Sequence, residues 1–131
     1  MSVDKLESLL DAIANLRGWS DPSSVAYQIR NPLLIQSFSL PGKNEIDSEG
    51  HRVFKTEISG LHSCLYDLTL KVKGESRAGL KKEDKLENLL RVYGVGKRSD
   101  QEKVVMFLKK ALHTGDISVE TPLTYFYQES K

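Results

Sequence analysis

Residues 51–73, HRVFKTEISGLHSCLYDLTLKVK, decide between two fold classes. Apolar residues recur here at steps of three and four positions, which gathers them on one side of a helix; they are Phe54, Ile58, Leu61, Leu65, Leu68 and Val72. A competing strand pattern covers residues 66–73, where apolar and polar residues alternate. The helical pattern covers more of the stretch, so we predict a helix, although Gly60 costs about 1 kcal/mol relative to Ala inside one.

Helical patterns also flank this stretch. They predict helices over residues 3–17, 21–28, 81–93 and 99–115, and a short helix after Thr121-Pro122. We therefore predict an all-α fold in which residues 1–131 form a single-domain bundle of five or six helices. The alternative is an α+β fold with a small hairpin within residues 51–73.

Turn and capping residues place the ends of the predicted helices. Gly18 suits the end of the first helix, and Asp21-Pro22 suits the start of the second. Within Ser99–Glu102, the hydroxyl and the carboxylate can form a capping box at the start of another helix. Residues 39–50 are rich in Pro, Gly, Asn and Asp, so we predict a loop there.

Composition limits the class of protein. The chain has 131 residues, of which 39% are hydrophobic and 28% charged, as in a soluble globular domain. Its one cysteine, Cys64, excludes a disulfide within the chain and indicates a reducing compartment. No apolar run reaches the roughly 18 residues that span a bilayer. We therefore expect a cytoplasmic protein without a membrane partner.

Catalytic and metal-binding patterns are weak. His62 and Cys64 are two positions apart, which directs them to different sides of a helix. His51 and His113 have no acidic or cysteine partner at a metal-ligand spacing. We therefore predict a protein that is not an enzyme and that needs no metal or cofactor.

The turn Gly94-Val95-Gly96 invites two comparisons with phosphate-binding motifs. A P-loop needs Ser or Thr after its Gly-Lys pair, and Arg98 stands there instead. A helix-hairpin-helix motif has a similar outline, but Asp100 occupies a position that prefers a small apolar residue. We interpret the glycines as an interhelical turn, with Gly94 closing one helix.

Charge is unevenly distributed along the chain, although the net charge is only +1. Residues 71–110 contain twelve Lys and Arg against six Asp and Glu, whereas acidic residues dominate on both sides. Such asymmetry is typical of a surface that faces a polyanion, and these side chains could contact a sugar-phosphate backbone without recognising bases. The candidate nucleic-acid-binding residues are Lys71, Lys73, Arg77, Lys81, Lys82, Lys97, Arg98, Lys103 and Lys110.

In size, in helical pattern and in these nine basic residues, the chain resembles the small subunit of CRISPR effector (Cascade-type) complexes. The resemblance implies a small helical bundle that holds nucleic-acid strands by backbone contacts and touches neighbouring protein subunits. It also implies a role in antiviral defence within a larger ribonucleoprotein.

Two readings of the function remain open. The first is a non-catalytic subunit that binds the backbone of DNA or RNA, with other protein subunits as partners, including further copies of this chain. The second is a protein-interaction adaptor without a nucleic-acid role, whose interface would include Met106, Leu70 or the apolar patch Leu33–Phe38.

Overall fold

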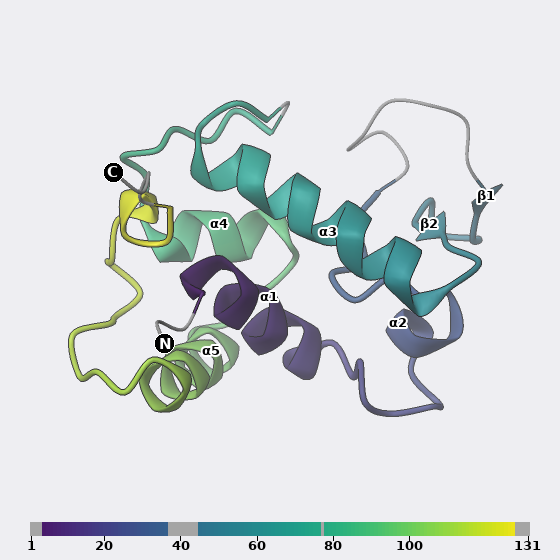
Figure 1. The fold of residues 1–131 in the computed structure, drawn as a ribbon, viewed down its shortest axis with the longest axis horizontal. Helices are drawn as coiled ribbons and strands as arrows, with labels where there is room; N and C mark the ends of the chain where they lie inside the picture. Colours follow the sequence, from purple (N-terminus) through teal and green to yellow (C-terminus); the bar gives the residue numbers. More distant parts are fainter. Residues whose placement is uncertain (1–3, 37–44, 77, 128–131) are drawn as a thin grey trace.

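The computed structural model describes residues 4–36, 45–76 and 78–127, and its regular structure is mainly helical (Figure 1). The five α-helices of the described residues are α1 (Lys5–Leu16), α2 (Val25–Gln28), α3 (Glu57–Val72), α4 (Leu86–Val92) and α5 (Arg98–Ala111). Two short strands, β1 (Glu45–Ile46) and β2 (Arg52–Val53), pair in antiparallel fashion, and a 3-10 helix, η2 (Leu123–Tyr125), follows α5.

Helix α3 confirms the helical interpretation of the deciding stretch and corrects its start. Thr56 Oγ1 accepts the N–H of Ser59 at 3.1 Å, and this cap starts the helix at Glu57 rather than near residue 51. The helix continues to Val72, so the prediction of a helix is confirmed and the competing strand interpretation of residues 66–73 is wrong.

The hairpin lies earlier in the chain, and a purely all-α bundle is therefore not confirmed. The α+β alternative fits better, but only β2 falls within residues 51–73, and β1 was expected to be loop. Asp47 explains the turn between the strands, because its Oδ1 accepts the N–H groups of Glu49 and His51, each at 2.9 Å. The rest of the predicted loop, residues 39–44, lies outside the described residues.

Four other helix starts differ from their predictions. Helix α4 begins at Leu86 rather than near residue 81, with Lys85 at the cap position. Asp4 caps α1, which begins at Lys5. Ser24 caps α2, a single turn, so Asp21-Pro22 does not start that helix.

Helix α5 begins at Arg98, so residues Ser99–Glu102 lie within the helix and the expected capping box does not form. Lys97 takes the cap position, so Ser99 already lies in the first helical turn. The buried Gln101 amide donates to the Val95 carbonyl at 3.0 Å and holds the preceding turn against the helix.

The core is built around α1, which lies between α3 on one side and α5 on the other (Figure 1). Its residues Leu9 and Ile13 are fully buried, as are Leu68 of α3 and Leu108 of α5. The segment after α5 closes the far end, where Leu86 N–H donates to the Thr121 carbonyl at 2.8 Å. The short helix predicted there is present as η2.

Candidate functional site

Four of the nine candidate basic residues lie at or on helix α5, and we call them the α5 basic group: Lys97, Arg98, Lys103 and Lys110. All four are exposed. Lys103 pairs with Asp100 at 3.8 Å, while the other three make no ion pair within the described part of the chain. Lys103 and Lys110 also line a shallow groove of about 380 Å³, together with Glu102 and Met106.

A second set of candidates follows α3. Lys81 and Lys82 are exposed and form no ion pair with a described residue. Lys73 is half-buried, with Nζ 3.8 Å from Glu75 and 5.2 Å from the centre of the Tyr127 ring. Arg77 lies outside the described residues.

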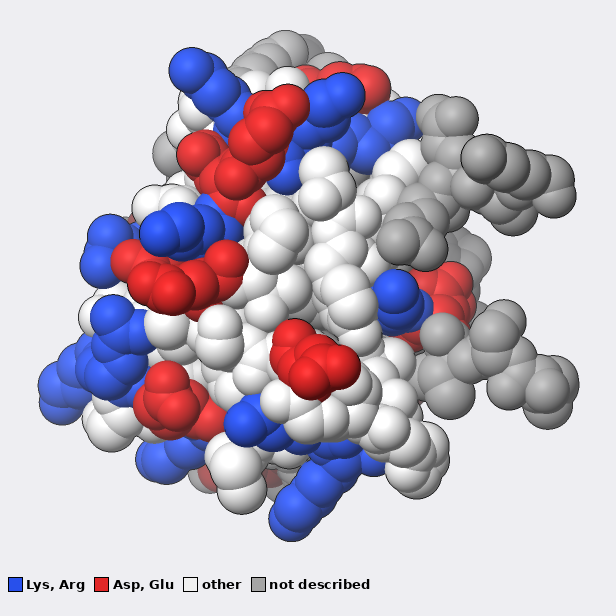
Figure 2. Space-filling model, turned by 90° about the vertical axis from the view of Figure 1, so that its left-hand side faces the viewer, with Lys and Arg blue, Asp and Glu red and all other residues white. Residues whose placement is uncertain are grey.

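The two sets are separated in space. The connection that carries Lys73, Lys81 and Lys82 runs along the top of Figure 1, whereas α5 lies at the bottom, with α4 and α1 between them. Figure 2 shows one face of the molecule, on which Lys and Arg are interleaved with Asp and Glu rather than forming one continuous basic area. Exposed ion pairs of this kind contribute little to stability and reduce the local positive potential.

The ninth candidate, Lys71, is not on the surface. It is 4% exposed, and its ammonium donates to Asp67 Oδ2 one helical turn earlier on α3. Lys71 is therefore unavailable to the backbone of a nucleic acid, and we leave it out of the proposed surface.

The candidate adaptor interface is also partly internal. Leu33 and Ile35 are buried in the core, Leu70 packs against it, and Phe38 lies outside the described residues. Met106 remains exposed, at 55%.

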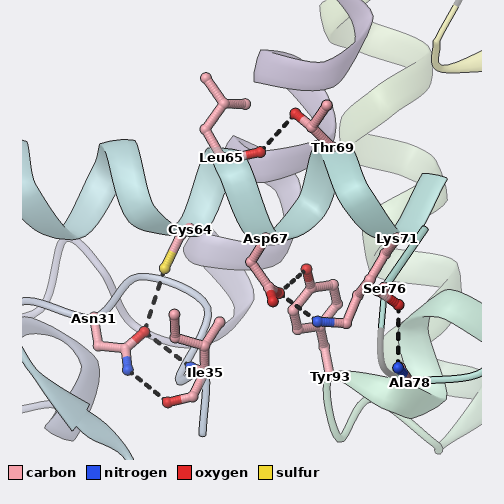
Figure 3. Close-up of polar contacts among 10 residues, drawn as sticks. All are labelled: Asn31, Ile35, Cys64, Leu65, Asp67, Thr69, Lys71, Ser76, Ala78 and Tyr93. Atoms are coloured by element: carbon pink, nitrogen blue, oxygen red, sulfur yellow. Dashed lines mark hydrogen bonds and ion pairs between the residues drawn. The ribbon is translucent and has the colours of Figure 1, made fainter. Parts of the chain in front are cut away.

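A buried polar cluster, which is absent from the candidate sites predicted above, joins α3 to the end of α4. Asp67 and Lys71 meet the hydroxyl of Tyr93, which donates to Asp67 Oδ2 at 2.7 Å (Figure 3). Lys71 Nζ also lies 4.7 Å from the centre of the Tyr93 ring. Burial, followed by the nearby Asp67 charge, raises the pKa of Tyr93 well above its ordinary value, so the phenol keeps its proton.

Arg17 approaches the same place from the end of α1. Its guanidinium donates to the Tyr93 carbonyl, and its buried Nε has no hydrogen-bond partner in the part of the chain that the structure describes. Burial lowers its pKa, while the charge of Asp100 acts in the opposite direction. Gly94 makes the approach possible, because a Cβ there would lie 2.5 Å from Arg17 Nη2.

These groups border a pocket of about 450 Å³. Its polar walls include Arg17, Lys71, Tyr93 and His51, whose Nδ1 is 3.0 Å from Asp47 Oδ2. Its apolar walls come from three separate places in the chain, and they are Leu34 with Ile35, Ala78 and Val92. A concave, partly apolar site with a few convergent polar groups is the usual form of a small-molecule site.

The cysteine belongs to the core. Cys64 is fully buried, and its Sγ donates to Asn31 Oδ1 at 3.3 Å (Figure 3). Burial raises the pKa of the thiol to about 12, which leaves almost no thiolate near neutral pH. No group of three or more His, Cys, Asp or Glu in the described part of the chain could hold a metal ion.

One sequence signal could have revealed the buried cluster. Asp67 and Lys71 are four positions apart, and both lie on the side of the helix that carries Cys64 and Leu68. Charged residues inside an apolar stripe indicate a paired, buried site when a partner is near. Tyr93 supplies that partner from 26 positions further along the chain. The pattern of apolar residues does not indicate that these two positions meet in space.

Comparison of the chain with models of known protein families, with curated proteins and with solved structures finds no match. Among the described helices, none has the length and apolar character required to cross a bilayer.

Proposed function

We propose that this protein is a non-catalytic helical subunit that binds the backbone of single-stranded nucleic acid through the α5 basic group. The observation that carries the proposal is the start of α5. Lys97 and Arg98 are exposed there without an acidic partner among the described residues. The N–H groups of Arg98 and Ser99 also have no acceptor among those residues, since the first backbone bond of the helix comes from Asp100.

A phosphate group suits this arrangement. The first amides of a helix point outward and carry a partial positive charge, which favours an anion. Lys103 and Lys110 extend the positive charge along the exposed side of the helix, so a strand could follow it over several nucleotides. Glu102 and Asp100 lie beside Lys103, and we therefore expect few phosphate contacts and modest affinity.

The resemblance to small subunits of CRISPR effector complexes favours a larger ribonucleoprotein as the place where this binding occurs. In such an assembly the protein would hold a strand by its backbone and contact neighbouring protein subunits. The same backbone contacts serve DNA and RNA, so both are tested.

The test is the salt dependence of binding to fluorescein-labelled single-stranded RNA and DNA, measured by fluorescence anisotropy. If four phosphates are neutralised, log K falls against log salt with a slope of about −3. The variant Lys97→Glu, Arg98→Glu, Lys103→Glu should lose binding, with stability changed by no more than about 0.5 kcal/mol because the sites are exposed.

A matched control carries the same change in net charge elsewhere. Lys55, Lys81 and Lys82 are exposed, and their replacement by Glu should leave most of the binding intact. Equal loss in both variants would mean that only total charge matters. Unchanged binding after reversal of the α5 residues would refute the proposal.

The adaptor function is the second candidate, and one observation favours it. Ile58 and Tyr66 are 67% and 57% exposed and lie two turns apart on α3. Large exposed apolar residues on one side of a helix are typical of an interface. If this is the functional surface, Ile58→Ser with Tyr66→Ser should abolish concentration-dependent self-association in sedimentation velocity, and the labelled strands should not bind.

A further inference from the structure

The pocket beside the buried cluster has the composition of a ligand site. Its volume of about 450 Å³ falls in the range of small-molecule sites, roughly 300 to 1,000 Å³. It lies among the end of α1, the second half of α3, the turn after α4 and the segment around Ile35. None of these walls belongs to the α5 basic group.

We propose that this pocket binds a small organic carboxylate, with Arg17 as the main partner of the carboxylate and the apolar walls as the seat of the hydrocarbon part. The proposal stands independently of nucleic-acid binding, because it uses different residues.

Arg17 carries the first part of the argument. Its guanidinium is half-buried and lines the pocket, and its Nε has no acceptor among the described residues. No acidic side chain of the described residues lies within ion-pair distance of the guanidinium. A carboxylate in the pocket would balance the charge of the guanidinium where Arg17 lines the wall, since arginine and carboxylate groups match in geometry.

Lys71 and Asp67 explain why the pocket favours an anion rather than a cation. Lys71 lines the pocket, and its ammonium has three donors, one of which is given to Asp67. The Asp67 carboxylate is 1% exposed and is already occupied by Lys71 and Tyr93. Of the acidic groups, Glu49 lines the pocket from an exposed position, and Asp47 is paired with His51.

The apolar walls decide the class of carboxylate. Ile35 is buried, and Leu34 and Val92 bring further aliphatic surface to the same space. An aromatic or branched aliphatic body would bury apolar area there, which inorganic anions cannot do. We therefore expect discrimination between benzoate and inorganic phosphate.

The experiment titrates benzoate, its neutral analogue benzyl alcohol, and inorganic phosphate into the ¹⁵N-labelled full chain. Saturable amide shifts are expected for Ile35, Tyr93 and Gly94 with benzoate. Binding of benzyl alcohol and of phosphate should each be about tenfold weaker or worse, because each lacks one of the two kinds of contact. Equal binding of phosphate, or no saturable shift with benzoate, would overturn the proposal.

Three variants test whether benzoate binds in this pocket. Arg17→Gln removes the charge and should weaken benzoate binding at least about tenfold, whereas Lys103→Gln makes the same charge change at the α5 groove and should have no effect. Ala78→Trp fills the pocket from an exposed position and should also abolish binding, which covers the case in which Arg17→Gln does not fold. Full binding by a folded Ala78→Trp variant would exclude this pocket.

Discussion

The hydroxyl group of Tyr93 donates a hydrogen bond of 2.7 Å to Asp67 Oδ2, and this contact joins the residue that ends α4 to the middle of α3. Lys71 donates to the same oxygen from the next turn of α3. The carboxylate therefore fixes two helices relative to each other and holds Lys71 and Tyr93, which both line the pocket. Its removal would affect both stability and the shape of the site.

Replacing Asp67 by Ala should destabilise the protein strongly. Lys71 would stay buried without its counter-ion, and Arg52, whose pKa is lowered by burial and raised by the Asp67 charge, would lose a favourable interaction. Removal of one partner of a buried pair costs about 3–5 kcal/mol. Urea unfolding followed by circular dichroism measures the change.

The reciprocal variant provides the comparison. Lys71→Met should cost less than Asp67→Ala, because the aspartate keeps the Tyr93 hydroxyl and the positive charge of Arg52. If both variants cost under about 1 kcal/mol, the pair behaves like an exposed one and the proposed role of burial is wrong.

Tyr93 should make stability fall at alkaline pH. Its pKa is raised by burial and by Asp67, so the native state keeps the phenolic proton while an unfolded tyrosine loses it above about pH 10. The native state then binds more protons than the unfolded state. The contribution of Tyr93 to the free energy of unfolding is complete below about pH 10 and decreases above it by at most about 1.4 kcal/mol per pH unit.

The variant Tyr93→Phe isolates this effect. It should be less stable than the parent by about 1.5–3 kcal/mol near neutral pH, because a charged acceptor loses a hydrogen bond. The difference should shrink as the pH rises above about 10. A difference in unfolding free energy that stays constant with pH would show that Tyr93 is not held in its protonated form.

The helical character of α3 could be predicted from the sequence, but the side it buries could not. The apolar spacing indicated Leu61 and Leu65, which are only half-buried, whereas Cys64, Asp67 and Lys71 lie inside. A count of apolar residues gives no weight to charged ones. The four-residue spacing of Asp67 and Lys71 also occurs in exposed helical pairs, so the spacing by itself does not mark this pair as buried.

The hairpin and the pocket depend on contacts that sequence periodicity does not contain. The strands are two residues long and too short for an alternating pattern to be recognised. The pocket brings together Arg17, Ile35, Lys71 and Val92 from separate parts of the chain. Only the packing of α1, α3 and α4 decides that these residues meet.

Gly60 should not tolerate alanine, although alanine favours helices by about 1 kcal/mol. A Cβ at this buried position would lie 1.8 Å from the Arg30 carbonyl oxygen and 3.4 Å from Pro32. The helix would have to move away from the α2 segment. We expect Gly60→Ala to destabilise by about 1–3 kcal/mol in urea unfolding, as overpacking does.

Gly96→Ala is the matched control, because a Cβ there meets nothing within 4 Å. It should be neutral or slightly stabilising through the lower entropy of the unfolded chain. A Gly60→Ala variant more stable than the parent would mean that α3 and the Arg30 backbone are not in contact.

Cys64 should be protected from alkylation in the native protein. The thiol is fully buried, so the reagent cannot reach it. Burial also raises its pKa to about 12, so almost no reactive thiolate forms at about pH 8, where an ordinary cysteine begins to ionise. Iodoacetamide labelling followed by intact mass measurement should show almost no modification in buffer and complete modification in urea. The variant Asn31→Ala, which removes the 3.3 Å contact with Sγ and two donors that hold the neighbouring backbone, should be labelled faster. Rapid labelling of the unaltered protein in buffer would place Cys64 on the surface and contradict the packing of α3 against the Asn31 segment.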